Sequence, residues 1–215
     1  MKKAPRRLWL PLLLGLAAIL LWNTFVAYPF RVFVVFLHEI SHGLAAILTG
    51  GELVSIGLSV HEGGVAVTRG GSRFLVLTAG YLGSLLFGAL FLLLGARRRW
   101  APGVIGLIGI FTLVVTLAYV RSWFGFLYGL LAAATLIVFA SKLKPEASEI
   151  LLTAIGVMSC LYAVWDIASD VLLRSIPCSD ASALADLTGV PAVVWGVLWI
   201  VASLWVIAAV LRKLA

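Results

Sequence analysis

Long apolar runs are the feature that most constrains the fold of this chain. A membrane-crossing helix needs about 20 consecutive apolar residues, and seven stretches of roughly that length occur here. These candidate spans are residues 8–28, 29–49, 74–95, 103–120, 123–140, 150–172 and 191–211. Charged residues make up only 12% of the chain, against about 25% in soluble domains. The pattern predicts an all-α integral membrane protein, a bundle of about seven transmembrane helices that forms a single domain over residues 1–215.

Two stretches between the spans differ from the rest. Residues 51–72 alternate between apolar and polar side chains around a turn at Gly63-Gly64, a pattern typical of a β-hairpin. Open strand edges cannot face lipid, so we expect the hairpin to lie at the membrane interface or to re-enter a cavity lined by protein. Residues 173–190 are polar and indicate a loop before the last span, with room for one amphipathic turn.

The net charge of +7 does not indicate nucleic-acid binding. Basic residues gather at the ends of the apolar runs, as in Arg97 to Arg99, which is typical of anchors that contact the headgroups of a lipid bilayer. In a seven-span arrangement the Lys and Arg residues divide equally between the two sides and do not set the orientation. A cytoplasmic N-terminus, in a multi-pass protein of the cell membrane, is favoured by the basic residues that lead the first span. These are Lys2, Lys3, Arg6 and Arg7.

The first apolar run could also be a signal peptide. The run over residues 8–28 is longer than a typical signal-peptide core, and no small-x-small cleavage site follows it. We therefore interpret it as an uncleaved first span.

The second span carries the motif His38-Glu39-Ile40-Ser41-His42. Residues four apart lie on one face of a helix, so both imidazoles can converge on one metal ion. Glu39 lies beside them, where it can accept a proton from a zinc-activated water that attacks a carbonyl group. The alternative is a pair of helix-packing histidines near an acid, but ionisable groups at membrane depth are costly and need a partner. The motif therefore predicts a zinc site.

Catalytic zinc needs three protein ligands and one open position, so a third ligand must lie elsewhere. Besides Glu39, the only acidic residues inside the candidate spans are Asp166 and Asp170, which share a face of the sixth span. Asp166 lies deeper in the membrane and is the predicted ligand, and Asp170 is either an outer partner or the alternative ligand. His61 precedes the hairpin turn and would be a ligand only if the hairpin folded back onto the site.

With these features the chain resembles the site-2 protease family of intramembrane zinc metallopeptidases, in particular its small bacterial members. The resemblance rests on the motif in an early span, the hairpin after it, the segment 79–84 that opens the next span, and an aspartate near the end of a late span. It implies that His38 and His42 bind zinc and that Glu39 is the general base. It also implies a site that opens toward the cytoplasm.

The resemblance further implies that the late aspartate, here Asp166, is the third zinc ligand. In the family this aspartate usually lies in a Leu-Asp-Gly or Asn-Pro-Asp-Gly context, whereas here it is flanked by Trp165 and Ile167. Asp170 therefore stays open as the alternative.

The function predicted from the sequence is an intramembrane zinc metalloprotease that hydrolyses peptide bonds of membrane proteins or membrane-associated peptides. A substrate helix would have to unwind, because a helical carbonyl group is already hydrogen-bonded. The hairpin could then pair with the unwound strand. Two other classes fit the same motif: a zinc-binding membrane protein without proteolytic activity, such as a transporter or scaffold, and a zinc-dependent lipid hydrolase.

Overall fold

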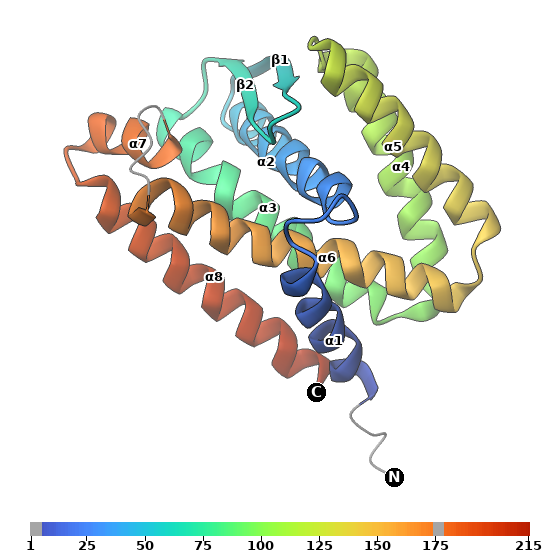
Figure 1. The fold of residues 1–215 in the computed structure, drawn as a ribbon. Helices are drawn as coiled ribbons and strands as arrows, with labels where there is room; N and C mark the ends of the chain where they lie inside the picture. The colour runs from blue at the N-terminus through green and yellow to red at the C-terminus, as the bar shows by residue number, and fades with distance from the viewer. Residues whose placement is uncertain (1–5, 174–178) are drawn as a thin grey trace.

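The computed structural model describes residues 6–173 and 179–215, which form a helical bundle with one small hairpin (Figure 1). The basic residues Lys2 and Lys3 and residues 174–178 of the predicted polar loop lie outside the described residues. In chain order the elements are α1 (Arg6–Leu20), α2 (Tyr28–Leu48), β1 (Glu52–Leu58), β2 (Gly64–Arg69), α3 (Arg73–Gly95), the 3-10 turn η1 (Arg98–Trp100), α4 (Ala101–Tyr119), α5 (Trp123–Lys142), α6 (Pro145–Ile167), the π-helical turn η2 (Ala168–Leu173), α7 (Asp180–Thr188) and α8 (Ala192–Leu214).

Within these described residues, six helices are long and apolar enough to cross a membrane, and a shorter apolar helix covers Leu8–Leu20. The predicted fold class of a helical membrane bundle is confirmed. The first span is shorter than its predicted range of 8–28, because α1 ends at Leu20 and turns follow until Tyr28. Thr24 donates its hydroxyl hydrogen bond to the carbonyl of Leu21 in these turns, and a proline at the start of α2 favours a new helix there.

The centre of the bundle is the packing of α6 against α3 and of α3 against α2. Glycine permits the closest approach of α3 and α6: a Cβ atom on Gly156 would lie 2.9 Å from the carbonyl oxygen of Gly88. Small residues let helix backbones approach in a membrane, where lipid is as apolar as the side chains. This crossing fixes the late part of α6 beside α2, which carries the histidine motif.

The hairpin predicted after the second span is confirmed as an antiparallel pair, with Glu52 opposite Arg69 at its base and Leu58 opposite Gly64 at its tip. It lies along α2 rather than apart from the bundle. The side chain of Ile56 is fully buried, and the backbone carbonyl of this residue accepts a hydrogen bond from the N–H of Arg121 after α4. One edge of β1 is therefore occupied by β2 and the other by the α4–α5 connection.

The polar stretch predicted as a loop contains the helix α7. Ser179 caps its first turn by accepting a hydrogen bond from the N–H of Ser182, and Gly189 ends it in the left-handed conformation. These are ordinary start and stop signals of a helix, with alanines between them, so the prediction of a loop was wrong for this part of residues 173–190. The helix packs against α3 and α8.

The bundle has two distinguishable ends (Figure 1). At the hairpin end, α2 and α6 finish, α3 and α8 begin, and α7 and the base of the hairpin lie beside them. At the opposite end, which we call the terminal end, Leu8 of α1 packs against a cluster that contains Val210 and Leu214 of α8. The start of α1 and the end of α8 therefore lie at the end away from the hairpin.

Candidate metal centre

The motif on α2 is buried inside the bundle. The rings of His38 and His42 lie with their centroids 4.8 Å apart, one helical turn from each other. Glu39 and His42 are 5% and 7% exposed. Three neighbouring ionisable side chains are thus held away from solvent, which is costly unless they share a partner.

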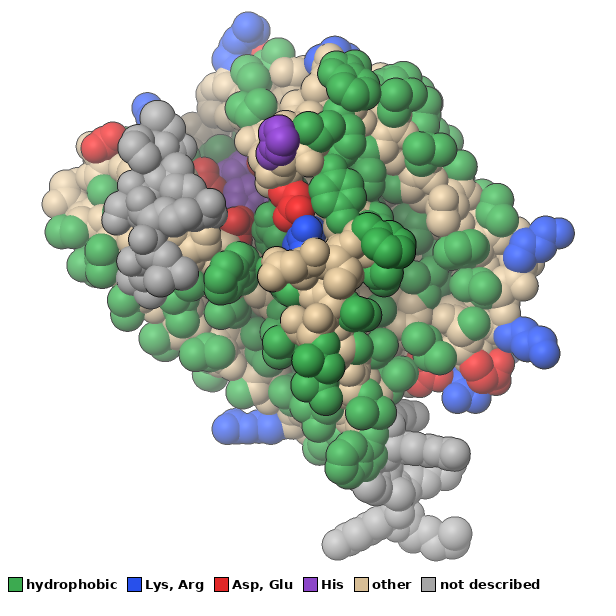
Figure 2. Space-filling view, viewed as in Figure 1, with side chains coloured by type: hydrophobic (Ala, Val, Ile, Leu, Met, Phe, Trp, Pro, Cys, Tyr) green, Lys and Arg blue, Asp and Glu red, His purple; other side chains and the backbone are tan. Residues whose placement is uncertain are grey.

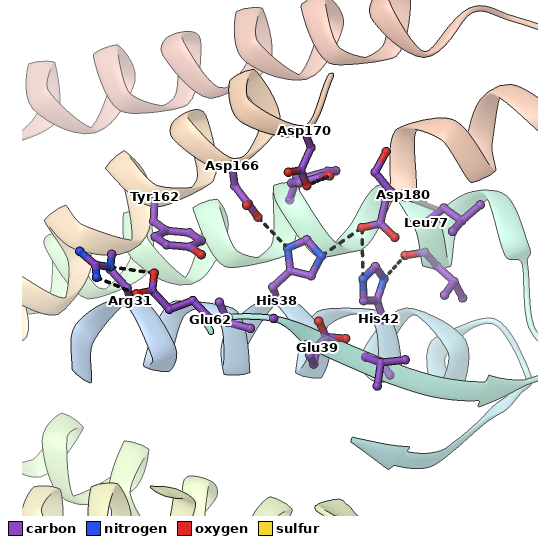
Figure 3. Close-up of a pocket in the computed structure, with 18 of the residues that line it drawn as sticks. Arg31, His38, Glu39, His42, Glu62, Leu77, Tyr162, Asp166, Asp170 and Asp180 are labelled. Atoms are coloured by element: carbon purple, nitrogen blue, oxygen red, sulfur yellow. Dashed lines mark hydrogen bonds and ion pairs between the residues drawn. The ribbon is translucent and has the colours of Figure 1, made fainter. Parts of the chain in front are cut away.

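The partner that the structure supplies is Asp180, the first residue of α7. Its Oδ2 atom lies 3.0 Å from Nε2 of His38 and 3.2 Å from Nε2 of His42 (Figure 3). Ligand atoms of these three residues lie within 4.8 Å of one another, and among the described residues this is the group that could hold a metal ion. One carboxylate oxygen of Asp180 therefore faces Nε2 of both imidazoles.

The donor set fits zinc. Two imidazole nitrogens and one carboxylate oxygen are donors that catalytic zinc uses, with a fourth position left open. Nδ1 of His42 lies 2.7 Å from the carbonyl oxygen of Val76, which can only accept, so Nδ1 carries the proton and Nε2 offers its lone pair. Burial alone would raise the pKa of Asp180, but the hydrogen bonds that His38 and His42 donate when Nε2 is protonated hold this pKa well below its usual range. A bound metal ion would replace the protons on the two Nε2 atoms. The carboxyl group is thus an anion, the form that binds a metal.

Gly80 on α3 makes room for this group. A Cβ atom at this position would collide with both imidazoles and with the carboxylate of Asp180. The order of residues alone does not show that this glycine faces the histidines.

Glu39 lies beside the histidines and under the second strand of the hairpin. A Cβ atom on Gly64 would collide with the carboxylate of Glu39, and the backbone of Ala66 lies close to it. The strand therefore passes directly over the residue predicted to act as the base.

The other predicted site residues lie around this group but outside it. Asp166 approaches His38 from the opposite side of the ring, with its Oδ2 atom 3.9 Å from Nδ1. Asp170 accepts a hydrogen bond of 2.9 Å from the hydroxyl of Tyr81. His61 lines the cavity near the hairpin tip.

The prediction of Asp166 as the third ligand does not correspond to the observed group. One imidazole cannot direct both ring nitrogens at one ion, and Nε2 of His38 faces Asp180. Asp180 lies in the polar stretch outside the apolar spans, so the acidic residues within those spans do not point to it. The signal that could have found it is a helix cap, Ser179-Asp180, that folds the polar stretch back over the end of the bundle.

A cavity of about 1100 Å³ opens beside the group of His38, His42 and Asp180. Its walls include the histidine motif, Asp166 of α6, Asp170 of η2, Ser179 and Asp180, and the hairpin residues 63–66. Figure 2 shows histidine and acidic side chains gathered in a hollow of a face that is otherwise largely hydrophobic. Among the described residues β2 pairs only with β1, so its second edge is open on the side of this cavity.

Six long apolar helices around a buried group of two histidines and an aspartate define a multi-pass membrane protein with a candidate metal centre. The family model described as Peptidase M50B-like matches residues 12–210. The chain therefore belongs to this family, which is the site-2 protease family, and the resemblance inferred from the motif is confirmed. Neither curated protein sequences nor solved structures gave a match.

Proposed function

We propose that this protein is an intramembrane zinc metalloprotease that hydrolyses peptide bonds of membrane proteins or membrane-associated peptides. The observation that carries the proposal is the buried group of His38, His42 and Asp180 with Glu39 beside it, in a chain of a peptidase family. The cavity next to this group lies among apolar helices, where a membrane-bound substrate can reach it.

The zinc ion would be held by Nε2 of His38, Nε2 of His42 and the carboxylate of Asp180. Bound there, zinc supplies Lewis-acid chemistry, because it polarises a carbonyl group and makes a water molecule acidic near neutral pH. Asp166, on the Nδ1 side of His38, would orient this imidazole, as carboxylates commonly do for metal-bound histidines.

Glu39 would act as the general base and then as the general acid. It accepts a proton from the attacking water as the new C–O bond forms. It returns this proton to the amide nitrogen as the C–N bond breaks, so that a free amine leaves. Its contact with the backbone of Ala66 and its burial restrict the carboxylate to few orientations, which favours proton transfer in one geometry.

The open edge of β2 would bind the substrate backbone. A transmembrane substrate has its carbonyl groups hydrogen-bonded within a helix, so several residues must unwind before hydrolysis. An extended segment can recover these hydrogen bonds by adding to a free strand edge. Because β2 also contacts Glu39, the added strand would run past the base.

We also propose that the N- and C-termini lie in the cytoplasm. Cytoplasmic loops of membrane proteins carry an excess of Lys and Arg. At the terminal end, nine of the described basic residues are found: Arg6, Arg7, Arg97, Arg98, Arg99, Lys142, Lys144, Arg212 and Lys213. At the hairpin end there are three: Arg69, Arg73 and Arg121. Arg31 lies within α2, paired with Glu62, and is counted with neither end. The equal division counted over seven full spans changes because α1 and α2 do not form two separate full crossings.

With this orientation the cavity opens on the non-cytoplasmic side, opposite to the opening that the family resemblance implies. Single cysteines at Glu52 and at Lys213, in a background without the two native cysteines, test this in intact cells. A membrane-impermeant maleimide is expected to label the cysteine at position 52 and not the one at 213. The reverse labelling would contradict the proposed orientation.

Hydrolysis assays distinguish the proposed protease from the two other classes. Purified zinc-loaded protein is incubated in liposomes with transmembrane peptides and, separately, with the lipids alone, and a matched Glu39→Gln variant is the control. The proposal predicts cleavage of a peptide that depends on Glu39. Lipid hydrolysis alone would indicate a lipid hydrolase, and zinc binding with no Glu39-dependent turnover would indicate a transporter or scaffold.

A further inference from the structure

The tip of the hairpin is tied to the start of α2 by two side chains of that helix. Arg31 donates two hydrogen bonds to Glu62, from Nε at 2.8 Å and from Nη2 at 2.6 Å. Tyr28 donates a hydrogen bond of 2.8 Å to the carbonyl of Val60. The side chains of the ion pair are only 11% and 23% exposed. A two-point pair shielded from water fixes the relative position of its partners, which a single solvated contact does not.

The backbone at the tip gives independent support for a positional role. Glu62 has a φ of 62° and, in the part of the chain that the structure describes, is the one non-glycine residue with positive φ. This conformation is unfavourable for a glutamate and persists where the surroundings enforce it. A glycine, such as the neighbouring Gly63, adopts a positive φ at lower cost. The carboxylate at position 62 therefore has a role that offsets the strain.

Arg31 extends the connection to α6 through an aromatic side chain. Its Cζ atom lies 5.9 Å from the ring centroid of Trp22, and this ring stacks on Tyr162 at 5.9 Å. The remaining nitrogen, Nη1, is buried without a hydrogen-bond partner among the described residues. Two of the three guanidinium nitrogens of Arg31 are thus hydrogen-bonded to Glu62 and the third is buried, so Arg31 does not present a free guanidinium group to a substrate.

The strand that follows the tip is the one that covers the base. Gly64 and Ala66 contact Glu39, and they lie two and four residues after Glu62. A displacement of the tip would move these contacts and the open edge of β2 together. We infer that Arg31 and Glu62 are positioning residues that hold β2 against Glu39 and align both with the metal centre. This inference rests on the proposed function.

Kinetic analysis of Arg31→Gln and Glu62→Gln tests the inference. Each variant is expected to lower kcat by about tenfold or more, with zinc content unchanged, because the base and the strand lose their alignment while the ligands stay in place. The charge-swapped double variant Arg31→Glu/Glu62→Arg is expected to recover at least half of the lost activity on a logarithmic scale. Tyr28→Phe removes the second tether without leaving a buried charge and is expected to lower kcat in the same direction by a smaller factor.

The hairpin offers a matched control at its other end. Arg69 and Glu52 form an ion pair of 3.0 Å between the two strands, but both side chains are exposed and neither reaches α2. Glu52→Gln is expected to leave kcat within about twofold of the wild type, as exposed pairs contribute little.

A readout without turnover separates this inference from the proposed function. Amide hydrogen exchange across β2 is expected to accelerate at least tenfold in Arg31→Gln and not in Glu52→Gln, whether or not a substrate has been found. Unchanged exchange in β2, or a kcat of Arg31→Gln within twofold of an active wild type, would overturn the inference. A wild-type protein that binds zinc but cleaves no peptide would instead count against the proposed function.

Discussion

Replacement of Asp180 by alanine removes the carboxylate oxygen that lies 3.0 and 3.2 Å from the two Nε2 atoms. Zinc sites with four protein ligands bind with about 10–16 kcal/mol at pH 7, or roughly 2.5–4 kcal/mol for each ligand if the total is shared equally. Since about 1.4 kcal/mol corresponds to a tenfold change in affinity, Asp180→Ala is expected to weaken zinc binding by about 10²- to 10³-fold.

Asp166→Ala is the informative comparison, because the sequence predicts this residue as the third ligand. Its Oδ2 atom lies 3.9 Å from Nδ1 of His38, too far for a good hydrogen bond, and the side chain is 24% exposed. Loss of a group that hydrogen-bonds to a metal ligand, without binding the metal itself, costs about 10- to 100-fold in metal affinity. We expect the lower end of this range, about tenfold. Asp186→Ala, an exposed acid on the same helix as Asp180, is the matched control and should not change the affinity.

The assay is a competitive titration of zinc against a chelator of known affinity, with the purified variants in detergent. Thermal unfolding in the absence of metal checks that each variant is folded. A larger loss of affinity in Asp166→Ala than in Asp180→Ala would refute the assignment drawn from the structure and restore the one drawn from the sequence. If both variants bind zinc as tightly as the wild type, the third ligand lies outside α6 and α7, and His61 is the next candidate.

Three further outcomes are expected. Glu39→Gln should keep its zinc but lose peptide hydrolysis by several orders of magnitude, because the base is not a ligand; zinc analysis and turnover of the same sample test this, and turnover at the wild-type rate would refute it. Gly80→Ala should lose zinc binding because the new methyl group collides with the ligands, whereas Gly103→Ala, which has open space around it, should bind zinc normally; normal binding in both would contradict the geometry. Gly156→Val should lower the free energy of unfolding by about 1–3 kcal/mol through overpacking against Gly88, as measured by denaturant titration, and an unchanged stability would show that this helix crossing is not tightly packed.

The spans and the histidine motif could be predicted because each depends on residues close together in the sequence. An apolar run reports its own burial in lipid, and the spacing of His38 and His42 sets their common helix face. The alternation before Gly63-Gly64 likewise predicts the hairpin. In each case the local pattern and the three-dimensional structure carry the same information.

The remaining features depend on contacts between distant segments. Asp180 reaches the histidines only because Ser179 starts a helix that lies over the end of the bundle, and the spacing of residues does not reveal that position. The lack of room for a side chain at Gly80 and the pairing of Arg31 with Glu62 can likewise be seen only once the helices and the hairpin are packed together. The end of α1 at Leu20 has a different cause. The apolar run continues past this residue, and the helix ends at local turns that hydrophobicity does not predict.

The zinc content of purified wild-type protein and of the His38→Ala/His42→Ala double variant tests the central claim most directly. Elemental analysis should give about one zinc per wild-type chain and essentially none in the double variant, because the two imidazoles supply two of the three ligands. X-ray absorption at the zinc edge should show nitrogen and oxygen neighbours at about 2.0–2.2 Å and no sulfur. Full zinc retention in the double variant, or a folded wild-type protein that takes up no zinc, would contradict the account.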